Sequence, residues 1–329
     1  MLPWSDTLVL TMVALVADAL IGDPDWLWRR LAHPVALIGR AIAALDRALN
    51  RETWSPARRK LFGIITILLL IIASLLLGYA IEAIIPRGLA GNIALGLLAS
   101  TLIAQKSLYQ HVARVHAAFG TGGLAAARDA VSLIVGRDPN SLDESGVSRA
   151  AIESCAENFS DGVVAPTLWL ALFGLPGLLA YKAINTADSM IGHRSGRYRD
   201  FGWASARLDD LVNFIPARLS GLMLVLAAPA ARGSMRSALK AMWRDARKHR
   251  SPNAGWPESA MAAALGLRLA GPRRYAEGLI DDPYLNTDGR DAAPADIRRA
   301  LRMLVTACLI EFVILAIPAL CLIALRQTE

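Results

Sequence analysis

Residues 61–85 read LFGIITILLLIIASLLLGYAIEAII, and Glu82 is the one charged side chain among them. A helix of about 20 apolar residues spans the hydrocarbon core of a bilayer, so this stretch predicts a transmembrane helix. Residues 89–104 follow after the short turn Pro86-Arg87-Gly88, which predicts a tight helical hairpin. Residues 301–325 form a further clear span, with Glu311 inside it. We therefore expect an all-α, polytopic integral membrane protein.

The composition leads to the same fold class. Of the 329 residues, 54% are hydrophobic and only 19% are charged, an apolar excess too large for one soluble core. Residues 8–21 resemble a signal peptide in length but lack a basic start and a cleavage site, so we interpret them as a short retained transmembrane helix. No soluble domain boundary stands out, which predicts one membrane-embedded domain over residues 1–329.

Two other apolar segments are interrupted. Prolines and glycines break residues 163–184 at Pro166, Gly174, Pro176 and Gly177, and residues 211–231 contain Pro216, Pro229 and a charged Arg218. Interrupted helices are tolerated in a bilayer only where protein or a wet cavity satisfies the freed backbone groups. These segments are either broken spans or re-entrant ones, which leaves four to six full crossings.

Basic residues flank the apolar runs and give a net charge of +7. Because lysine and arginine accumulate in cytoplasmic loops, the segments at about 22–60, 106–161 and 231–300 are predicted to be cytoplasmic, with amphipathic helices. The arginines of residues 185–210 favour the inside as well, which favours re-entrant segments on both sides. This pattern predicts a multi-pass protein of the inner (plasma) membrane, with lipid and not nucleic acid as its partner.

Acidic residues cluster at two places. Asp18 ends an apolar helix, where an acid opposes the helix dipole, and with Asp23 it offers two carboxylates for a divalent cation; the alternative is an ordinary Gly-Asp-Pro turn. Glu153, Glu157 and Asp161 share one helical face, in a helix that the capping-box pattern of residues 141–144 opens. Their mutual repulsion favours a cation or a basic partner; the alternative is a solvated acidic face.

The densest polar cluster, YKAINTADSMIGHR at residues 181–194, emerges from an apolar segment. Polar residues there are costly and therefore functional by default. Asn185, Asp188 and Gly192 lie on one helical face, and Asp and Asn oxygens suit Mg²⁺. Asp209 and Asp210, with Asn213 one turn later, form a second metal-binding face or a solvated acidic pair. His193 taken alone is equally well an interfacial histidine.

A proline- and glycine-rich loop, KHRSPNAGWPE, occupies residues 248–258. Asn253, Trp256 and Glu258 offer hydrogen bonds and a flat apolar plate for a large ligand; the alternative is a helix-connecting loop. The chain contains no P-loop, no GxGxxG before a helix and no GxSxG motif, so any nucleotide site is a non-standard one.

These strings together resemble the CobD/CbiB family, the adenosylcobinamide-phosphate synthases of cobalamin biosynthesis. The resemblance covers nearly the whole chain in the expected order and is carried by DALIGDP (18–24), HPV (33–35), ESCAENFSDG (153–162), residues 181–194, YRDFG (198–202), RLDDLVNFIP (207–216) and SPNAGWPE (251–258). It implies an amide-forming ligase that joins adenosylcobyric acid to (R)-1-aminopropan-2-ol or its O-phosphate, with ATP and Mg²⁺.

The resemblance also implies roles for the clustered residues. Mg²⁺ is assigned to Asp188, Asp209 and Asp210, with Asp23 as a further candidate. Phosphate contacts are assigned to Lys182 and Arg194, and the remaining nucleotide contacts to Asn185, Ser189 and Asn213. Asp188 is also expected to be catalytic, His193, Glu153 or Glu157 is the expected base, and Asn253 and Trp256 line the corrinoid site.

Because a corrinoid, ATP and the amine are cytosolic, the site is expected on the cytoplasmic side. Other late cobalamin-pathway enzymes are expected partners, and the oligomeric state stays open. Two rival classes are a membrane transporter and a membrane sensor or regulatory protein. Broken helices suit a transporter, but we find no inverted repeat, and the polar clusters lie at segment ends. A sensor would not need Asn185, Asp188 and His193 together.

Overall fold

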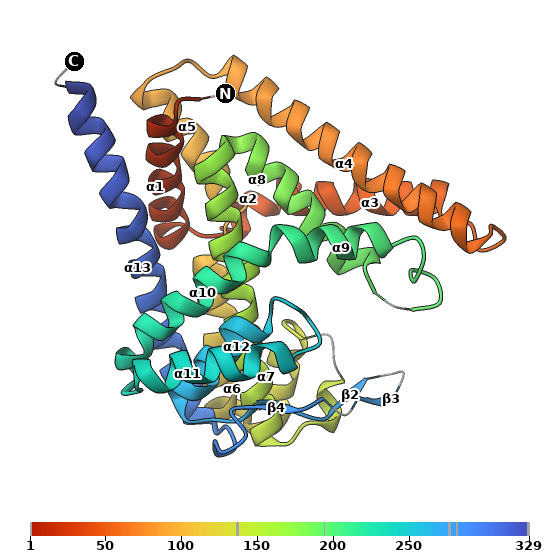
Figure 1. Cartoon of the computed structure of the whole chain (residues 1–329), viewed down its shortest axis with the longest axis vertical. Coiled ribbons are helices and arrows are strands. Elements are labelled where there is room, and N and C mark those ends of the chain that lie inside the picture. Colours follow the sequence, from red (N-terminus) through yellow and green to blue (C-terminus); the bar gives the residue numbers. More distant parts are fainter. Residues whose placement is uncertain (1, 136–137, 194, 276–277, 281, 328–329) are drawn as a thin grey trace. The chain divides into compact units, whose positions relative to one another are not determined.

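The chain is predominantly helical in the computed structural model, which describes residues 2–135, 138–193, 195–275, 278–280 and 282–327 (Figure 1). Within these ranges, five helical stretches are long and apolar enough to cross a membrane: Pro56–Ile84, Leu89–Ser132, Glu144–Ile191, Phe214–Ala231 and Pro294–Leu322. This finding confirms the predicted fold class. The short helix predicted from residues 8–21 forms as α1 (Trp4–Leu20) and, with 17 residues, is not one of the five.

The α-helices that follow α1 are α2 (Asp25–Trp28), α3 (Pro34–Leu49), α4 (Pro56–Ile84), α5 (Leu89–Ser100), α6 (Gln105–Ser132), α7 (Glu144–Phe159), α8 (Ala165–Ile191), α9 (Trp203–Val212), α10 (Phe214–Ala227), α11 (Met235–Asp245), α12 (Gly255–Leu265) and α13 (Pro294–Gln327). Single helical turns are η1 (Pro139–Ser141), the π-helical η2 (Ser160–Val164), η3 (Ala228–Ala231) and η4 (Ala246–Lys248). The strands are β1 (Leu269–Ala270), β2 (Arg273–Tyr275), β3 (Gly278–Ile280) and β4 (Tyr284–Leu285).

The chain divides into two compact units. Unit 1 comprises residues 1–104, 165–213 and 315–329, and unit 2 comprises residues 105–164 and 214–314. The expectation of a single membrane-embedded domain stays a prediction.

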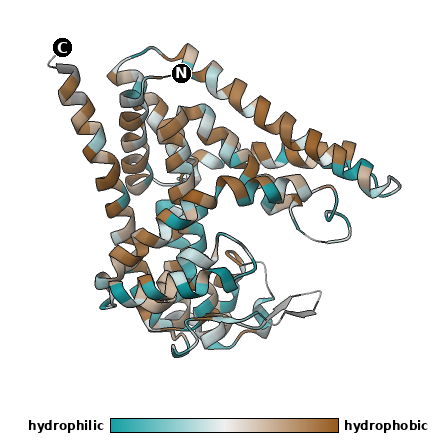
Figure 2. Cartoon of the chain, viewed as in Figure 1, coloured by the Kyte–Doolittle hydropathy of each residue, from teal (hydrophilic) through white to brown (hydrophobic). Residues whose placement is uncertain are grey.

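Apolar side chains cover the outward faces of the long helices. Figure 2 shows hydrophobic residues along most of α4 and α13. On α4, Leu69, Ile72 and Leu76 are exposed, and on α13 Leu309 and Ile317 are exposed. Large apolar faces of this size are not left to water. They are the surfaces that lipid covers.

Helix α8 is the centre of unit 1 and packs against α4, α1, α9 and α3. Its C-terminal half contributes Ile184 and Ile191 to a buried core that also contains Ile42 of α3, Ile67 of α4 and Phe201. Because this core fixes α8 against α9, it also fixes the polar side chains that the two helices carry at their ends.

The predicted interruption of residues 163–184 is present as a kink in α8. Gly174 adopts the left-handed region with φ 68°, and Pro176 follows inside the helix. The backbone N–H of Leu175, freed by the kink, donates to Oε1 of Glu82 on α4 at 2.9 Å. A polar group from a neighbouring helix therefore satisfies the break, as lipid requires, and this contact explains the charged residue in the otherwise apolar α4.

Two other local expectations need correction. The turn at residues 86–88 is present, but α5 packs extensively against α1 and hardly against α4, so α4 and α5 do not form a tight hairpin. Helix α7 is capped by Asp143, whose Oδ1 accepts from the N–H of Gly146 at 2.7 Å, and not by Ser141. Asp143 lies directly before the first helical residue and is a good N-cap, so the capping box predicted from Ser141 is wrong.

Unit 2 contains α6, α7, α10, α11, α12 and most of α13. Two small antiparallel strand pairs, β1 with β4 and β2 with β3, join α12 to α13. These strands were not predicted from the sequence, because strands of two or three residues are too short to show an alternation of apolar and polar residues. They are a small addition to the helical fold.

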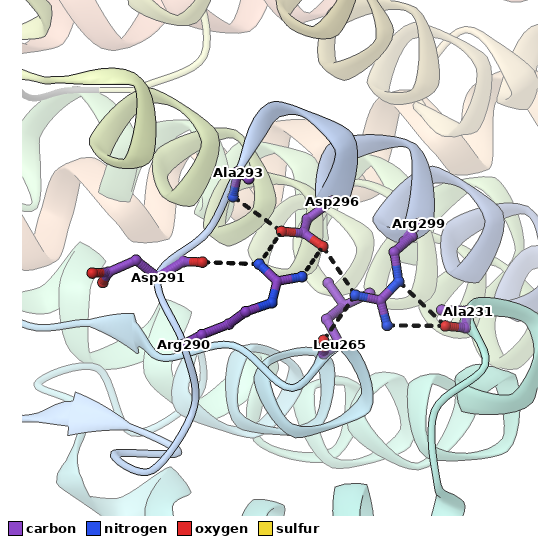
Figure 3. Close-up of polar contacts among 7 residues, drawn as sticks. All are labelled: Ala231, Leu265, Arg290, Asp291, Ala293, Asp296 and Arg299. Atoms are coloured by element: carbon purple, nitrogen blue, oxygen red, sulfur yellow. Dashed lines mark hydrogen bonds and ion pairs between the residues drawn. The ribbon is translucent and has the colours of Figure 1, made fainter.

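A buried carboxylate anchors the start of α13 (Figure 3). Asp296 is 2% exposed and receives two hydrogen bonds from Arg290, both at 2.7 Å. Arg299 donates to the same carboxylate at 2.9 Å and to the carbonyl oxygens of Ala231 and Leu265. One ion cluster thus ties the first turn of α13 to η3 and to the end of α12.

Replacing Asp296 with alanine should therefore lower the free energy of unfolding by about 3 kcal/mol, because it leaves Arg299 partly buried without its carboxylate. Thermal unfolding in detergent measures the change. The control is Asp291→Ala, which removes only the exposed pair with Arg268 and should cost about 1 kcal/mol or less. Equal destabilisation by the two variants would contradict the anchoring role of Asp296.

Candidate active site

Two carboxylates and two amides meet in unit 1 where α8 and α9 pack together. Helix α8 supplies Asn185 and Asp188, and α9 supplies Asp209. The Nδ2 group of Asn185 donates to Oδ1 of Asp209 at 3.2 Å. Asp209 is 9% exposed. Residues 24 positions apart in the chain thus form one polar cluster, which we call the α8–α9 cluster: Asn185, Asp188, Asp209 and Asn213.

The electrostatics of the α8–α9 cluster are unfavourable for two negative charges. Burial, together with the negative charge of Asp188, raises the pKa of Asp209 from 3.8 to about 7. The hydrogen bond from Asn185 opposes this rise only in part. Near neutral pH the Asp209 carboxyl is therefore poised between its two protonation states, and a cation would favour the ionised one.

Asn213 completes the cluster. It ends α9 as its C-cap and is 1% exposed. Tyr181 of α8 donates its hydroxyl to Oδ1 of Asn213 at 3.0 Å. Tyr181 is itself fully packed in the core. Its hydroxyl therefore orients an amide of the α8–α9 cluster, a role that the sequence analysis did not assign to it.

Gly192 follows the last residue of α8 and has no room for a side chain. A Cβ atom there would overlap Oδ1 of Asp188 and lie 2.7 Å from the Asp188 carbonyl oxygen. The carboxylate of Asp188 thus lies against the C-terminal end of its own helix, next to Gly192. The glycine that the helical spacing places on this face is needed because Asp188 occupies the space.

The segment between α8 and α9 is tied to α3 and α4. Asp46 of α3 accepts from Nη2 of Arg197 at 2.9 Å and from Asn50 at 2.8 Å. Arg59 of α4 donates to Asn50 at 3.0 Å and to the carbonyl oxygen of Arg197. These bonds fix the segment that connects α8 to α9. They therefore also fix the ends of the two helices that carry the α8–α9 cluster.

Other predicted residues of this region are placed less centrally. Lys182 is buried, whereas Ser189 is exposed and donates to the carbonyl oxygen of Asn185 at 3.0 Å. His193 is exposed, and Arg194 lies outside the described residues. Asp210 forms an ion pair with Arg207 at 3.4 Å. The roles of these residues stay predictions.

Asp23 pairs with His33, at 3.3 Å. Within the described ranges, no group of three or more His, Cys, Asp or Glu side chains is arranged to hold a metal ion. The four predicted metal ligands therefore do not form one all-carboxylate cage. A metal at the α8–α9 cluster would have two carboxylates, amide oxygen and water as ligands.

In unit 2, Glu153 and Glu157 have different surroundings. Glu153 is 3% exposed, accepts the backbone N–H of Ala270 at 2.7 Å and lies 3.9 Å from Arg149. These contacts hold β1 against α7. Glu157 is exposed, and the π-helical turn η2 interrupts the helical face before Asp161. The predicted single acidic face therefore does not continue to Asp161.

The loop before α12 and the first turn of α12 place two predicted ligand residues beneath an arginine. Asn253 and Trp256 are each 5% exposed. Asn253 Oδ1 accepts from Arg218 at 3.2 Å, and the guanidinium of Arg218 lies 4.5 Å from the centroid of the Trp256 ring. The sequence analysis noted Arg218 as a charge in an apolar segment but gave it no role. A charged residue inside an apolar segment is costly, and this feature of the sequence could have identified Arg218 as a functional residue.

A family model described as CobD/CbiB protein matches residues 11–304. The chain belongs to the CobD/CbiB family. It is 49% identical to the cobalamin biosynthesis protein CobD of Rhizobium meliloti (strain 1021), over 96% of this chain and 99% of that protein. It is 52% identical to the CobD of Sinorhizobium fredii (strain NBRC 101917 / NGR234), over 91% and 93%. No solved structure matches the chain.

Membership of the CobD/CbiB family confirms the resemblance inferred from the seven strings. It makes the chain a cobalamin biosynthesis protein and implies a corrinoid substrate. All the strings lie inside the matched range, whereas most of α13 beyond residue 304 lies outside it. The part of the chain that carries the candidate site is therefore also the part that defines the family.

Proposed function

We propose that the chain catalyses amide-bond formation between the carboxyl group of adenosylcobyric acid and the amine of (R)-1-aminopropan-2-ol or its O-phosphate. The observation that carries this proposal is the α8–α9 cluster in a CobD/CbiB protein. A buried carboxylate, Asp209, and a half-buried one, Asp188, lie with two amides at the ends of two helices, and this donor set suits a hydrated divalent cation.

The reaction needs an activated carboxyl group. Phosphoryl transfer from ATP converts the corrinoid carboxylate into an acyl phosphate and releases ADP. The amine nitrogen then attacks the acyl carbon, the C–O bond to phosphate breaks, and the nitrogen loses a proton. A base accepts that proton, since only a neutral amine is nucleophilic. Of the candidate bases, His193 and Glu157 are exposed, whereas Glu153 already binds a backbone N–H.

The donor set of the α8–α9 cluster fits Mg²⁺. This ion prefers one or two carboxylates, keeps several waters and uses substrate phosphates as its other ligands. Asp188 and Asp209 would hold it, and the amide oxygen of Asn185 is a further ligand, because its nitrogen is used by Asp209. When bound, Mg²⁺ neutralises charge on the transferred phosphoryl group.

The test is a reaction of the purified chain in detergent with adenosylcobyric acid, ATP, Mg²⁺ and aminopropanol phosphate, followed by mass analysis of the corrinoid. We expect one amide product, and we expect omission of ATP or of Mg²⁺ to abolish it. Replacing the phosphorylated amine with free aminopropanol shows which amine is used. If neither amine yields product while labelled corrinoid enters vesicles that contain the protein, the proposal is wrong and the transporter alternative is favoured.

A further inference from the structure

Unit 2 contains a cavity of about 640 Å³ lined by aromatic and basic side chains. Its aromatic walls come from Phe214 at the start of α10, Trp243 of α11 and Trp256 of α12. Arg218 and Arg247 are among its basic residues. Cavities of this volume hold small molecules. The cavity lies within one compact unit, so its walls are defined independently of unit 1.

Arg218 is held rigidly in this cavity. Its guanidinium lies 3.5 Å from the centroid of Phe214 and 4.5 Å from that of Trp256. Nη1 donates to the carbonyl oxygen of Phe214 at 2.6 Å and to Oδ1 of Asn253 at 3.2 Å. Since Nη1 makes both bonds, Nη2 and Nε are the groups that remain for a ligand. A guanidinium oriented in this way loses little entropy on binding.

The charges of the cavity are balanced only in part. His249 lies 3.6 Å from Glu258, and Arg250 lies 3.8 Å from Asp282. For Arg218 and Arg247, in contrast, the described part of the chain provides no carboxylate ion pair, and the two cations repel one another. Other arginines of the protein, such as Arg197 and Arg290, pair with carboxylates. An anion between Arg218 and Arg247 would relieve this repulsion.

We propose that this cavity binds the phosphate group of a ligand, with Arg218 and Arg247 as its charged donors. Two guanidiniums match the several oxygens of a phosphate better than a single carboxylate does, because each presents a planar fork of N–H donors. Trp243 is 59% exposed and supplies a flat apolar contact for the rest of the ligand. Asn253 and Trp256, which are nearly buried, act as positioning residues for Arg218.

Three sources of that phosphate share this chemistry: a nucleotide, a small phosphate monoester and a phospholipid headgroup. The lipid source is relevant because Met235 and Leu239 are exposed on the same face of α11 as Trp243. The inference stands on the geometry of unit 2 and does not need the amide-forming reaction. Its test is therefore a binding measurement and not a rate.

The test uses the full chain in phosphatidylcholine nanodiscs without divalent cations, with quenching of tryptophan fluorescence as the readout. The soluble probes are ATP and aminopropanol phosphate, and in a third arm phosphatidylglycerol is added to the nanodiscs. We expect Arg247→Ala to weaken binding of the preferred probe about tenfold or more. Arg247→Lys should weaken it less, because the charge remains but the fork is lost.

The matched control is Arg236→Ala, which removes an exposed arginine of α11 that does not line the cavity. It should change binding by less than about twofold, the size expected of a distant screened charge. Arg218→Lys, which keeps the charge but loses the planar fork that stacks on the rings and binds Asn253, should weaken binding like Arg247→Ala. Binding that none of the cavity variants weakens, or that Arg236→Ala weakens equally, would overturn the proposal. Failure of amide formation alone would leave it intact.

Discussion

Replacing Asp188 with alanine should lower the rate of amide formation by about a thousandfold while the protein stays in the membrane. The reason is the composition of the α8–α9 cluster, in which Asp188 and Asp209 are the two carboxylates. Without Asp188 a divalent cation has only the carboxylate of Asp209 left as a charged ligand in this cluster. Loss of metal assistance costs several kcal/mol of transition-state stabilisation, and about 4 kcal/mol corresponds to this factor.

Two further variants make the Asp188 prediction specific. Asp188→Asn keeps the size of the side chain and removes its charge, so it should be as inactive as Asp188→Ala. Asp129→Ala makes the same chemical change at an exposed position of α6 and should keep the wild-type rate. The rates come from mass analysis of the corrinoid, and immunoblots of the membrane fraction measure the protein. An Asp188→Asn variant with the wild-type rate would refute a charged role for Asp188.

Asp209→Asn should stabilise the metal-free protein at about pH 8 and remove its response to Mg²⁺. The pKa of Asp209 is raised to about 7 from 3.8, first by burial and then by the charge of Asp188. The folded state therefore holds this proton more tightly than the unfolded state does. The stability that the proton contributes is complete below about pH 4 and is lost as the pH rises through about 7.

The size of this effect follows from the same shift. Three pKa units correspond to about 4 kcal/mol, an order-of-magnitude figure for a side chain that is nearly buried. Asparagine carries no charge to bury, so the variant avoids the loss at high pH. Mg²⁺ favours the ionised carboxylate and should therefore stabilise the wild type at about pH 8, more than at about pH 5, but should not stabilise the variant.

Thermal unfolding in detergent, with Mg²⁺ or with a chelator, measures both effects across this pH range. The control is Asp210→Asn, since Asp210 is less buried and pairs with Arg207. A wild-type protein whose unfolding midpoint rises equally with Mg²⁺ at both pH values would contradict the assignment of Asp209. An Asp209→Asn variant that Mg²⁺ still stabilises would contradict this assignment as well.

Much of the fold follows from local patterns in the sequence. The apolar run at residues 61–85 is long enough to be a membrane helix whatever surrounds it, and α4 covers it. The glycine and prolines of residues 163–184 predict a break, and α8 has its kink at Gly174. The partner of α5 was predicted incorrectly, because a short turn says that two helices are adjacent in the chain but not that they pack.

The sequence by itself determined which polar and ionisable side chains the candidate site contains. It determined only the part of the geometry that lies within one helix. Helical spacing places Asn185, Asp188 and Gly192 on one face, because three and four residues are close to one turn. Nothing in that spacing brings Asp209 to Asn185, or joins Tyr181 to Asn213. Those contacts exist because the apolar core around Ile184, Ile191 and Phe201 packs α8 against α9.

The same distinction holds for charge and burial. Asp209 and Asp210 are neighbours in the sequence and look alike there, yet only packing makes Asp209 the buried one with the raised pKa. Trp256 was predicted to offer a flat apolar plate to a large ligand, and only tertiary contacts bury it and place it beneath Arg218. A sequence lists which groups are ionisable, but burial and the distance between charges set their energies, and both are properties of the folded chain.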